Sequence, residues 1–183
     1  MKHLAHIAKG IDITDALMQL EAHPELWDKH SVRTASYTSP HNRLSDIWLR
    51  YNAFENFDEK NPAAFNGEHD SVFYPAWNVL TELQRHVFDI MRFTCSVRLG
   101  GLLITRIPAG AVCEKHIDQG WHATYYNKYA LQLKAAPGQA FHFEDGAFES
   151  APGDLFTFDN SYTHWVTNDS KVDRVTLIVC ARS

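Results

Sequence analysis

The chain has 183 residues, 45% of them hydrophobic, which is the size and composition of one globular domain around a single core. The formal net charge of −5 and the lack of any cluster of Lys and Arg exclude nucleic acid as a main partner. Cys95, Cys113 and Cys180 are widely spaced, which excludes a disulfide framework and a CxxC zinc site and predicts a reducing, cytoplasmic compartment.

The N-terminal segment predicts neither a signal peptide nor a membrane anchor. Met1 to Gly10 alternates polar and apolar residues, whereas a signal peptide carries a continuous apolar stretch. The longest apolar runs, such as Val175 to Ala181, have the length of a strand and not of a membrane span. We therefore expect no membrane partner.

Residues 1–95 are expected to form a helical and irregular N-terminal elaboration packed on the core. A first helix is predicted to begin near Thr14, a plausible N-cap, and to end before His23-Pro24. The polar and aromatic stretch that follows contains one strand-like run, Ile47 to Tyr51. The clearest helix opens at Pro75 and carries one apolar stripe: Val79, Leu80, Leu83, Val87, Phe88 and Met91.

Residues 96–183 are expected to form the β-rich core. Short apolar runs are separated there by turn signals such as Pro137-Gly138 and Asp145-Gly146. Many short strands that follow helices are typical of a β-sandwich or jelly roll with helical buttresses, so the predicted fold class is mainly β with flanking helices. The predicted strands are Leu102 to Ile107, Thr124 to Leu133, Ala140 to Phe143, Leu155 to Phe158, His164 to Thr167 and Arg174 to Cys180.

A candidate metal-binding pair lies in the sequence His116-Ile117-Asp118. Residues i and i+2 of a strand share a face, so the imidazole and the carboxylate can converge on one ion while Ile117 packs behind. Spacing alone is weak evidence, because roughly one HxD is expected by chance among so many His and Asp residues. The pair His142-Phe143-Glu144 offers the same pattern as an alternative.

His164 is the candidate third ligand, since it stands at the start of a predicted strand, directly after a turn. Two histidines and one carboxylate form the facial triad that leaves positions open on Fe(II) for a co-substrate and oxygen. A structural zinc site would instead close its coordination sphere, usually with thiolates. The set His116, Asp118 and His164 thus predicts an iron centre suited to oxygen chemistry.

Arg174 lies ten positions beyond His164, inside an apolar strand. A guanidinium there is costly to bury unless it meets an anion, and a carboxylate is its best geometric match. The dicarboxylate 2-oxoglutarate would provide one. If the two residues face inward across a hairpin, its turn must contain an odd number of residues or a bulge. The alternative is a surface ion pair of Arg174 with Asp169 or Asp173.

Short motifs between Thr105 and Cys180 follow one another at characteristic spacings. In chain order they are Thr105, Pro108-Ala109-Gly110, His116, the alternating strand Lys128 to Leu133, Pro137-Gly138, Gly153 to Ser161, His164 to Asn168, and Arg174. The series resembles the aspartyl/asparaginyl β-hydroxylase-like branch of the 2-oxoglutarate oxygenases. This resemblance implies a double-stranded β-helix, a cupin-like jelly roll, that uses Fe(II), 2-oxoglutarate and O2.

The resemblance also implies roles for single residues. Arg174 is expected to bind the distal carboxylate of 2-oxoglutarate, with Thr105 hydrogen-bonding nearby and Lys128 helping at the co-substrate. Several members of the branch have Gly where this chain has Asp118, and a His where it has Ala130. Asp118 favours full ligation of the iron, and Gln132 or Tyr125 are alternative contacts for the co-substrate.

The expected substrate is an amino acid, or an aspartyl/asparaginyl-type side chain in a peptide, hydroxylated at an unactivated carbon with succinate and CO2 as co-products. Candidate substrate contacts are Arg50, Gln119, Trp121 and His122. Two alternatives from other classes remain, neither using 2-oxoglutarate: a cupin-type metal-binding isomerase or dioxygenase, and a noncatalytic sensor domain.

Overall fold

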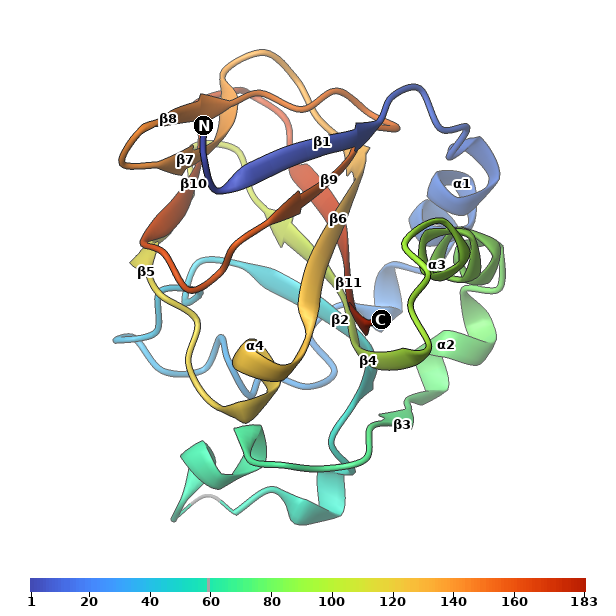
Figure 1. Cartoon of the computed structure of the whole chain (residues 1–183), viewed down its shortest axis with the longest axis vertical. Coiled ribbons are helices and arrows are strands. Elements are labelled where there is room, and N and C mark those ends of the chain that lie inside the picture. The colour runs from blue at the N-terminus through green and yellow to red at the C-terminus, as the bar shows by residue number, and fades with distance from the viewer. Residues whose placement is uncertain (59) are drawn as a thin grey trace.

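The computed structural model describes residues 1–58 and 60–183, which fold into two antiparallel sheets with helices against one of them (Figure 1). The larger sheet contains, in spatial order, β1 (Leu4–Ala8), β9 (Leu155–Phe158), β6 (Asn127–Lys134), β11 (Arg174–Arg182), β4 (Arg98–Ile107), β2 (Ser45–Tyr51) and β3 (Val72–Phe73). The smaller sheet contains β5 (Val112–His116), β10 (His164–Asn168), β7 (Gln139–Phe143) and β8 (Gly146–Phe148). The predicted double-stranded β-helix is confirmed.

The three described α-helices of the N-terminal half cover the outer face of the larger sheet (Figure 1). The described helical segments are α1 (Thr14–Ala22), α2 (Pro75–Val79), α3 (Glu82–Phe93), α4 (Trp121–Tyr125) and the 3-10 turns Pro24–Leu26, Phe54–Asn56 and Pro62–Asn66. Leu20 of α1 and Leu83 of α3 join the same buried cluster as Leu131 and Leu177 of the sheet. A second cluster, which includes Phe141 and Phe156, fills part of the space between the sheets.

Strand β11 shows how one apolar run serves both faces of the larger sheet. Side chains alternate along a strand, so Val175, Leu177 and Val179 pack toward the helices. Arg174, Thr176, Ile178 and Cys180 fall on the other face and line the interior between the sheets. The inward face can therefore carry polar groups although the strand reads as hydrophobic.

The single helix predicted from Pro75 is wrong, because the structure divides it. α2 ends at Val79, and α3 starts at Glu82. The break shifts the apolar stripe, so the face of α3 that meets the sheet is Leu83, His86, Val87 and Ile90, a regular helical spacing. Phe88, a member of the predicted apolar stripe, is 48% exposed.

The N-terminal half contributes more strands than the sequence indicated. β2 includes the predicted run Ile47 to Tyr51 and pairs with β4, while β1 and β3 were not predicted and add to the edges of the same sheet. Thr124 and Tyr125, predicted as strand, belong to α4, and β6 begins at Asn127. The division into an elaboration and a core at residue 95 stays a prediction.

The hairpin considered between His164 and Arg174 does not form. β10 belongs to the smaller sheet and β11 to the larger, so the chain crosses between sheets at this point. Asn168 fixes the crossing, since its Nδ2 donates to the carbonyls of Ile107 and Val172, each at 2.9 Å. His164 and Arg174 therefore lie on opposite walls of the interior, and the rule on turn length does not apply.

The described helices are all too short or too polar to cross a membrane. Cys95, Cys113 and Cys180 are free thiols, as the sequence predicted. The cytoplasmic compartment stays a prediction.

Candidate active site

The ends of two neighbouring strands bring the three predicted ligands together. β5 ends at His116 and β10 begins at His164, and these two residues are opposite each other in the sheet. Asp118 follows β5 in a loop, where its backbone N donates to the Asn160 carbonyl at 3.1 Å. One ligand atom from each residue lies within 4.8 Å of the others.

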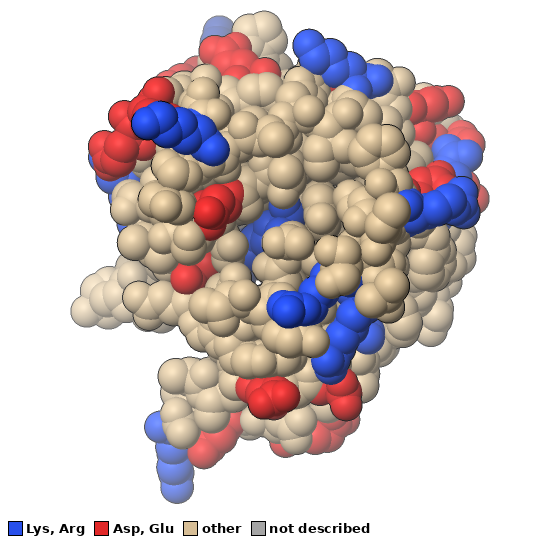
Figure 2. Space-filling view, viewed as in Figure 1, with Lys and Arg blue, Asp and Glu red and all other residues tan. Residues whose placement is uncertain are grey.

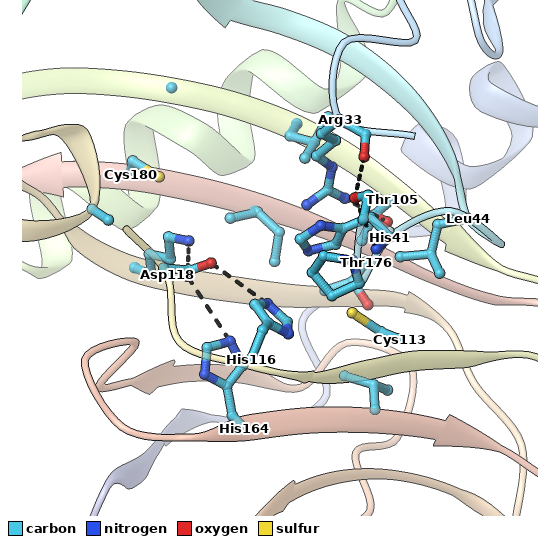
Figure 3. Close-up of a pocket in the computed structure, with 18 of the residues that line it drawn as sticks. Arg33, His41, Leu44, Thr105, Cys113, His116, Asp118, His164, Thr176 and Cys180 are labelled. Carbon is cyan, nitrogen blue, oxygen red and sulfur yellow. Dashed lines mark hydrogen bonds and ion pairs between the residues drawn. The ribbon is translucent and has the colours of Figure 1, made fainter. Parts of the chain in front are cut away.

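The strand geometry predicted for the His116 and Asp118 pair is wrong in one respect. Because β5 ends at His116, Asp118 is placed by the loop and not by strand alternation. Ile117 is 46% exposed and does not pack behind the ligands. The side chains nonetheless converge, as Figure 3 shows.

Backbone carbonyls set the tautomers of both histidines. Nδ1 of His116 donates to the Glu114 carbonyl at 2.7 Å, and Nδ1 of His164 donates to the Tyr162 carbonyl at 2.8 Å. A carbonyl only accepts, so each Nδ1 carries the proton and each Nε2 keeps its lone pair. These Nε2 atoms lie 3.5 Å and 3.9 Å from the two carboxylate oxygens of Asp118. Two free imidazole nitrogens beside a carboxylate fit the ligand set of iron(II).

Asp118 is held in its charged form. Burial by itself would raise its pKa, but the neighbouring Lys128 ammonium holds that pKa well below its usual range. Burial lowers the pKa of His164, which keeps its imidazole neutral. Lys128 Nζ contacts Asp118 Oδ2. The structure thus places Lys128 as a support for a ligand, and its expected help at the co-substrate stays a prediction.

The triad opens into a cavity of about 720 Å³ between the two sheets. Its wall includes Arg174, Thr105 and Lys128 from the larger sheet and His164 from the smaller one. Figure 2 shows one face of the molecule hollowed near its centre, with basic side-chain atoms inside the hollow. A volume of this size suits a small substrate together with a co-substrate.

Arg174 is a buried cation without an anion. It is 3% exposed, and Nη1 donates to Thr176 Oγ1 at 2.9 Å while Nη2 reaches Ser150 Oγ at 3.5 Å. Its Nε is buried with no partner, and it forms no ion pair with the residues that the structure describes. Burial lowers its pKa to about 10, so the group is still charged at neutral pH. The predicted surface alternative is wrong, since Asp173 accepts from the backbone N of Ala109.

A row of buried polar side chains crosses the larger sheet, and two of its members, Thr105 and Thr176, line the floor of the cavity. Asp46, Thr105, Thr176 and Gln132 stand opposite one another on the neighbouring strands β2, β4, β11 and β6. Gln132 Oε1 accepts from Ser150 Oγ at 2.8 Å and from Thr176 Oγ1 at 3.3 Å. The row places the predicted residue Thr105 next to Thr176, the partner of Arg174.

Arg33 is a cavity residue that the sequence did not reveal. Its Nε and Nη2 donate to the two carboxylate oxygens of Asp46 at 2.6 and 2.8 Å, and Nη2 also donates to Thr105 Oγ1 at 3.1 Å. Burial opposes the charge on Arg33, but Asp46 raises the pKa of the guanidinium. The available signal was Asp46, because an acidic residue directly before a predicted strand requires a cationic partner when it is buried.

The candidate substrate residues separate into two groups. Gln119 and His122 line the cavity, whereas Arg50 and Trp121 are not part of its described lining. The Arg50 guanidinium lies over the Phe73 ring at 4.8 Å and donates to the Ser71 carbonyl. Trp121 stacks on Tyr125 with ring centroids 4.8 Å apart.

The alternative ligand pair His142 and Glu144 points away from the triad. His142 stacks on Trp165 with ring centroids 5.0 Å apart, and its Nε2 lies 3.0 Å from Thr167 Oγ1. Glu144 pairs with Lys115. Neither belongs to a group of described residues that could share a metal ion.

We predict that mild acid destabilises the folded protein through His122. It is 6% exposed, accepts from the backbone N of Gly101 at 2.9 Å, and has a pKa that burial lowers to about 3. In the unfolded chain, His122 binds a proton near its ordinary pKa of about 6.5. Its contribution to the free energy of unfolding is therefore complete above pH 6.5 and is lost as the pH falls toward 3.

We expect the free energy of unfolding to fall by roughly 1 kcal/mol per pH unit in this window through His122. Urea unfolding of the wild type and His122→Gln at pH 7.5 and 5.5 measures it, because Gln can accept from Gly101 without titrating. An equal pH dependence in both proteins would contradict the assignment.

The sequence model of one known family, described as Aspartyl/Asparaginyl beta-hydroxylase, matches residues 15–182. The chain belongs to this family. The match confirms the resemblance carried by the motifs between Thr105 and Cys180 and extends it through the N-terminal half. The protein is a hydroxylase of the iron(II) and 2-oxoglutarate dependent class. The family assignment favours this class over the cupin-type and sensor alternatives.

Three solved structures resemble the hydroxylase in fold. An oxidoreductase of the 2OG-Fe(II) oxygenase family from Burkholderia pseudomallei is 14% identical, with a TM-score of 0.55 over 96% of this chain and 93% of that one. The viral collagen prolyl hydroxylase from Paramecium Bursaria Chlorella virus-1, in complex with 2OG, is 10% identical, with a TM-score of 0.59 over 99% and 96%. A prolyl hydroxylase from Trichoplax adhaerens, in complex with a hypoxia inducible factor peptide, is 11% identical, with a TM-score of 0.59 over 98% and 83%. A search of curated proteins found no match.

Proposed function

We propose that the protein hydroxylates an unactivated carbon of a carboxylate-bearing substrate, an amino acid or an aspartyl/asparaginyl-type side chain in a peptide, and converts 2-oxoglutarate to succinate and CO2. The observation that carries this proposal is Arg174. A guanidinium that is 3% exposed, charged and without an anion among the described residues needs a ligand that supplies one. It lines the same cavity as the triad.

The triad and Arg174 have different proposed roles. His116, Asp118 and His164 would hold Fe(II), which together with 2-oxoglutarate supplies the oxidising power drawn from O2. Lys128 keeps Asp118 charged and oriented. On the opposite wall, Arg174 would bind the distal carboxylate of 2-oxoglutarate, the role that the family resemblance gives it.

Hydroxyl groups complete the proposed anion site. Thr176 Oγ1 accepts from Arg174, and Thr105 stands opposite Thr176 on the next strand. Both side chains line the cavity. The Thr176 hydroxyl already donates to Gln132, whereas the Thr105 hydroxyl only accepts from Arg33, so Thr105 can donate to a carboxylate held by Arg174. This gives Thr105 the role that was expected for it.

The charges on the cavity wall favour an anionic substrate. Arg33 is matched by Asp46 and Lys128 by Asp118, which leaves Arg174 unmatched among the described residues. The charges of Fe(II) and of 2-oxoglutarate cancel each other, so one positive charge stays on the wall after both bind. Nη1 of Arg33 donates to none of the described residues and is available to a substrate carboxylate.

Anaerobic absorbance of the purified protein tests this function. With Fe(II) bound, addition of 2-oxoglutarate is expected to produce the weak visible band of a keto acid chelated to iron. Asp118→Ala should lose the band, because it removes the only carboxylate of the described triad. Glu144→Ala is the matched control, since Glu144 also lies two residues beyond a histidine but pairs with Lys115.

Two results would contradict the proposal: iron that binds without the band in the wild type, or a band that survives in Asp118→Ala. If the band behaves as expected, succinate formation is then measured with carboxylate-bearing amino acids and peptides and with their amides. Equal turnover of a carboxylate-bearing compound and its amide would contradict the proposed substrate class but not the proposed use of Fe(II) and 2-oxoglutarate.

A further inference from the structure

A second group of metal-ligand side chains lies beside the triad. One ligand atom each from His41, Cys113 and His116 lies within 4.8 Å of the others, the same spacing that joins the triad. Figure 3 shows the three side chains on the wall of the cavity, with Cys113 and His41 on one side of His116 and Asp118 and His164 on the other. His116 is thus common to both groups.

A bulge in β5 explains why Cys113 and His116 face the same way. Residues three apart in a regular strand point to opposite faces. Here His116 is opposite His164 and Cys113 is opposite Val166, so three steps along β5 match two steps along β10. The extra residue in β5 turns the Cys113 thiol toward the cavity, where it is 5% exposed.

The same bulge holds His41 in place. The backbone N of Glu114, inside the bulge, donates to the Pro40 carbonyl at 2.9 Å. The neighbouring ring of His41 meets the ring of His116 edge-on, with centroids 4.7 Å apart. The ring nitrogens of His41 make no hydrogen bond with residues 1–58 or 60–183, so they are free to bind a ligand.

We propose that His41, Cys113 and His116 form a second metal position, suited to zinc. Two imidazoles and a thiolate make a softer donor set than the triad, and such N and S ligands favour zinc over iron(II). On binding, the Cys113 thiol releases its proton to solvent and its sulfur joins the metal. Water takes the fourth place of the tetrahedron.

The two metal positions exclude each other. Nδ1 of His116 is committed to the Glu114 carbonyl, which leaves Nε2 as its single free ligand atom. A zinc ion bound with Cys113 therefore removes one ligand from the triad and prevents iron from binding there. Only this inhibitory effect rests on the proposed function, whereas the zinc position itself stands without it.

Titration with Co(II), a spectroscopic substitute for zinc, tests the position directly. The triad contains no sulfur, so a thiolate-to-cobalt charge-transfer band reports the second position alone. We expect the band in the full-length wild-type chain under anaerobic conditions and a stronger band in His164→Ala, which weakens the competing triad. Cys113→Ser should lose the band. Cys180→Ser is the matched control and should keep it, because Cys180 is also a buried thiol on the cavity wall.

His41→Ala provides a second, independent variant, since His41 is half-buried in an irregular segment. It should lower the affinity of the protein for Co(II), measured from the band, by at least about tenfold, the scale seen for residues that support metal ligands. The proposal is overturned if neither the wild type nor His164→Ala shows the band, or if the band survives in Cys113→Ser. If Cys113→Ser does not fold, an unchanged affinity in His41→Ala overturns it equally. Loss of the keto acid band alone would instead count against the proposed hydroxylase chemistry.

Discussion

Arg174→Met is expected to stabilise the protein without ligands and to abolish its response to 2-oxoglutarate. The guanidinium is buried with an unpartnered Nε, so a methionine of similar length removes an uncompensated charge and keeps most of the packing. Loss of the proposed partner of the distal carboxylate should weaken 2-oxoglutarate binding by about 2–5 kcal/mol. Thermal unfolding with Fe(II), with and without 2-oxoglutarate, measures both effects.

Arg182→Met is the matched control for this prediction. Arg182 lies on the same strand, β11, but is exposed, with its guanidinium over the Tyr125 ring at 4.2 Å. This variant should bind 2-oxoglutarate as the wild type does. The assignment of the anion site would be contradicted if Arg174→Met bound 2-oxoglutarate as tightly as the wild type, or if both variants lost the same amount of affinity for 2-oxoglutarate.

Local sequence patterns were enough to predict most of the strands and the three candidate ligands that the structure brings together. Short apolar runs between turn signals mark β9 and β11, and the candidate ligands His116, Asp118 and His164 are recognised by residue type and by the turns beside them. The burial of Arg174 was likewise predictable, because the guanidinium lies inside an apolar strand. Each of these inferences depends on neighbours within a few residues along the chain.

Features that depend on the crossing of the two sheets could not be predicted. The sequence between His164 and Arg174 reads as a hairpin, and only the pairing of β10 with β5 and β7 shows that the chain changes sheets there. Arg33 lies in an irregular segment without periodicity, and its role follows from contact with Asp46, thirteen residues away. The bulge that turns Cys113 inward is visible only in the register between β5 and β10.

His164→Ala is expected to lower the affinity for Fe(II) by at least about 100-fold, the upper end of the loss for residues that merely support a ligand. Its Nε2 is the free nitrogen that faces Asp118, and no other described histidine on β10 can replace it. Anaerobic titration with Fe(II) measures the loss. His142→Ala is the control, because His142 is paired with Trp165 on the neighbouring strand yet points away from the cavity. Arg174→Met should keep its iron, whereas His164→Ala should not. The two variants therefore distinguish metal binding by the triad from anion binding by Arg174. Equal iron binding in His164→Ala and His142→Ala would contradict the triad.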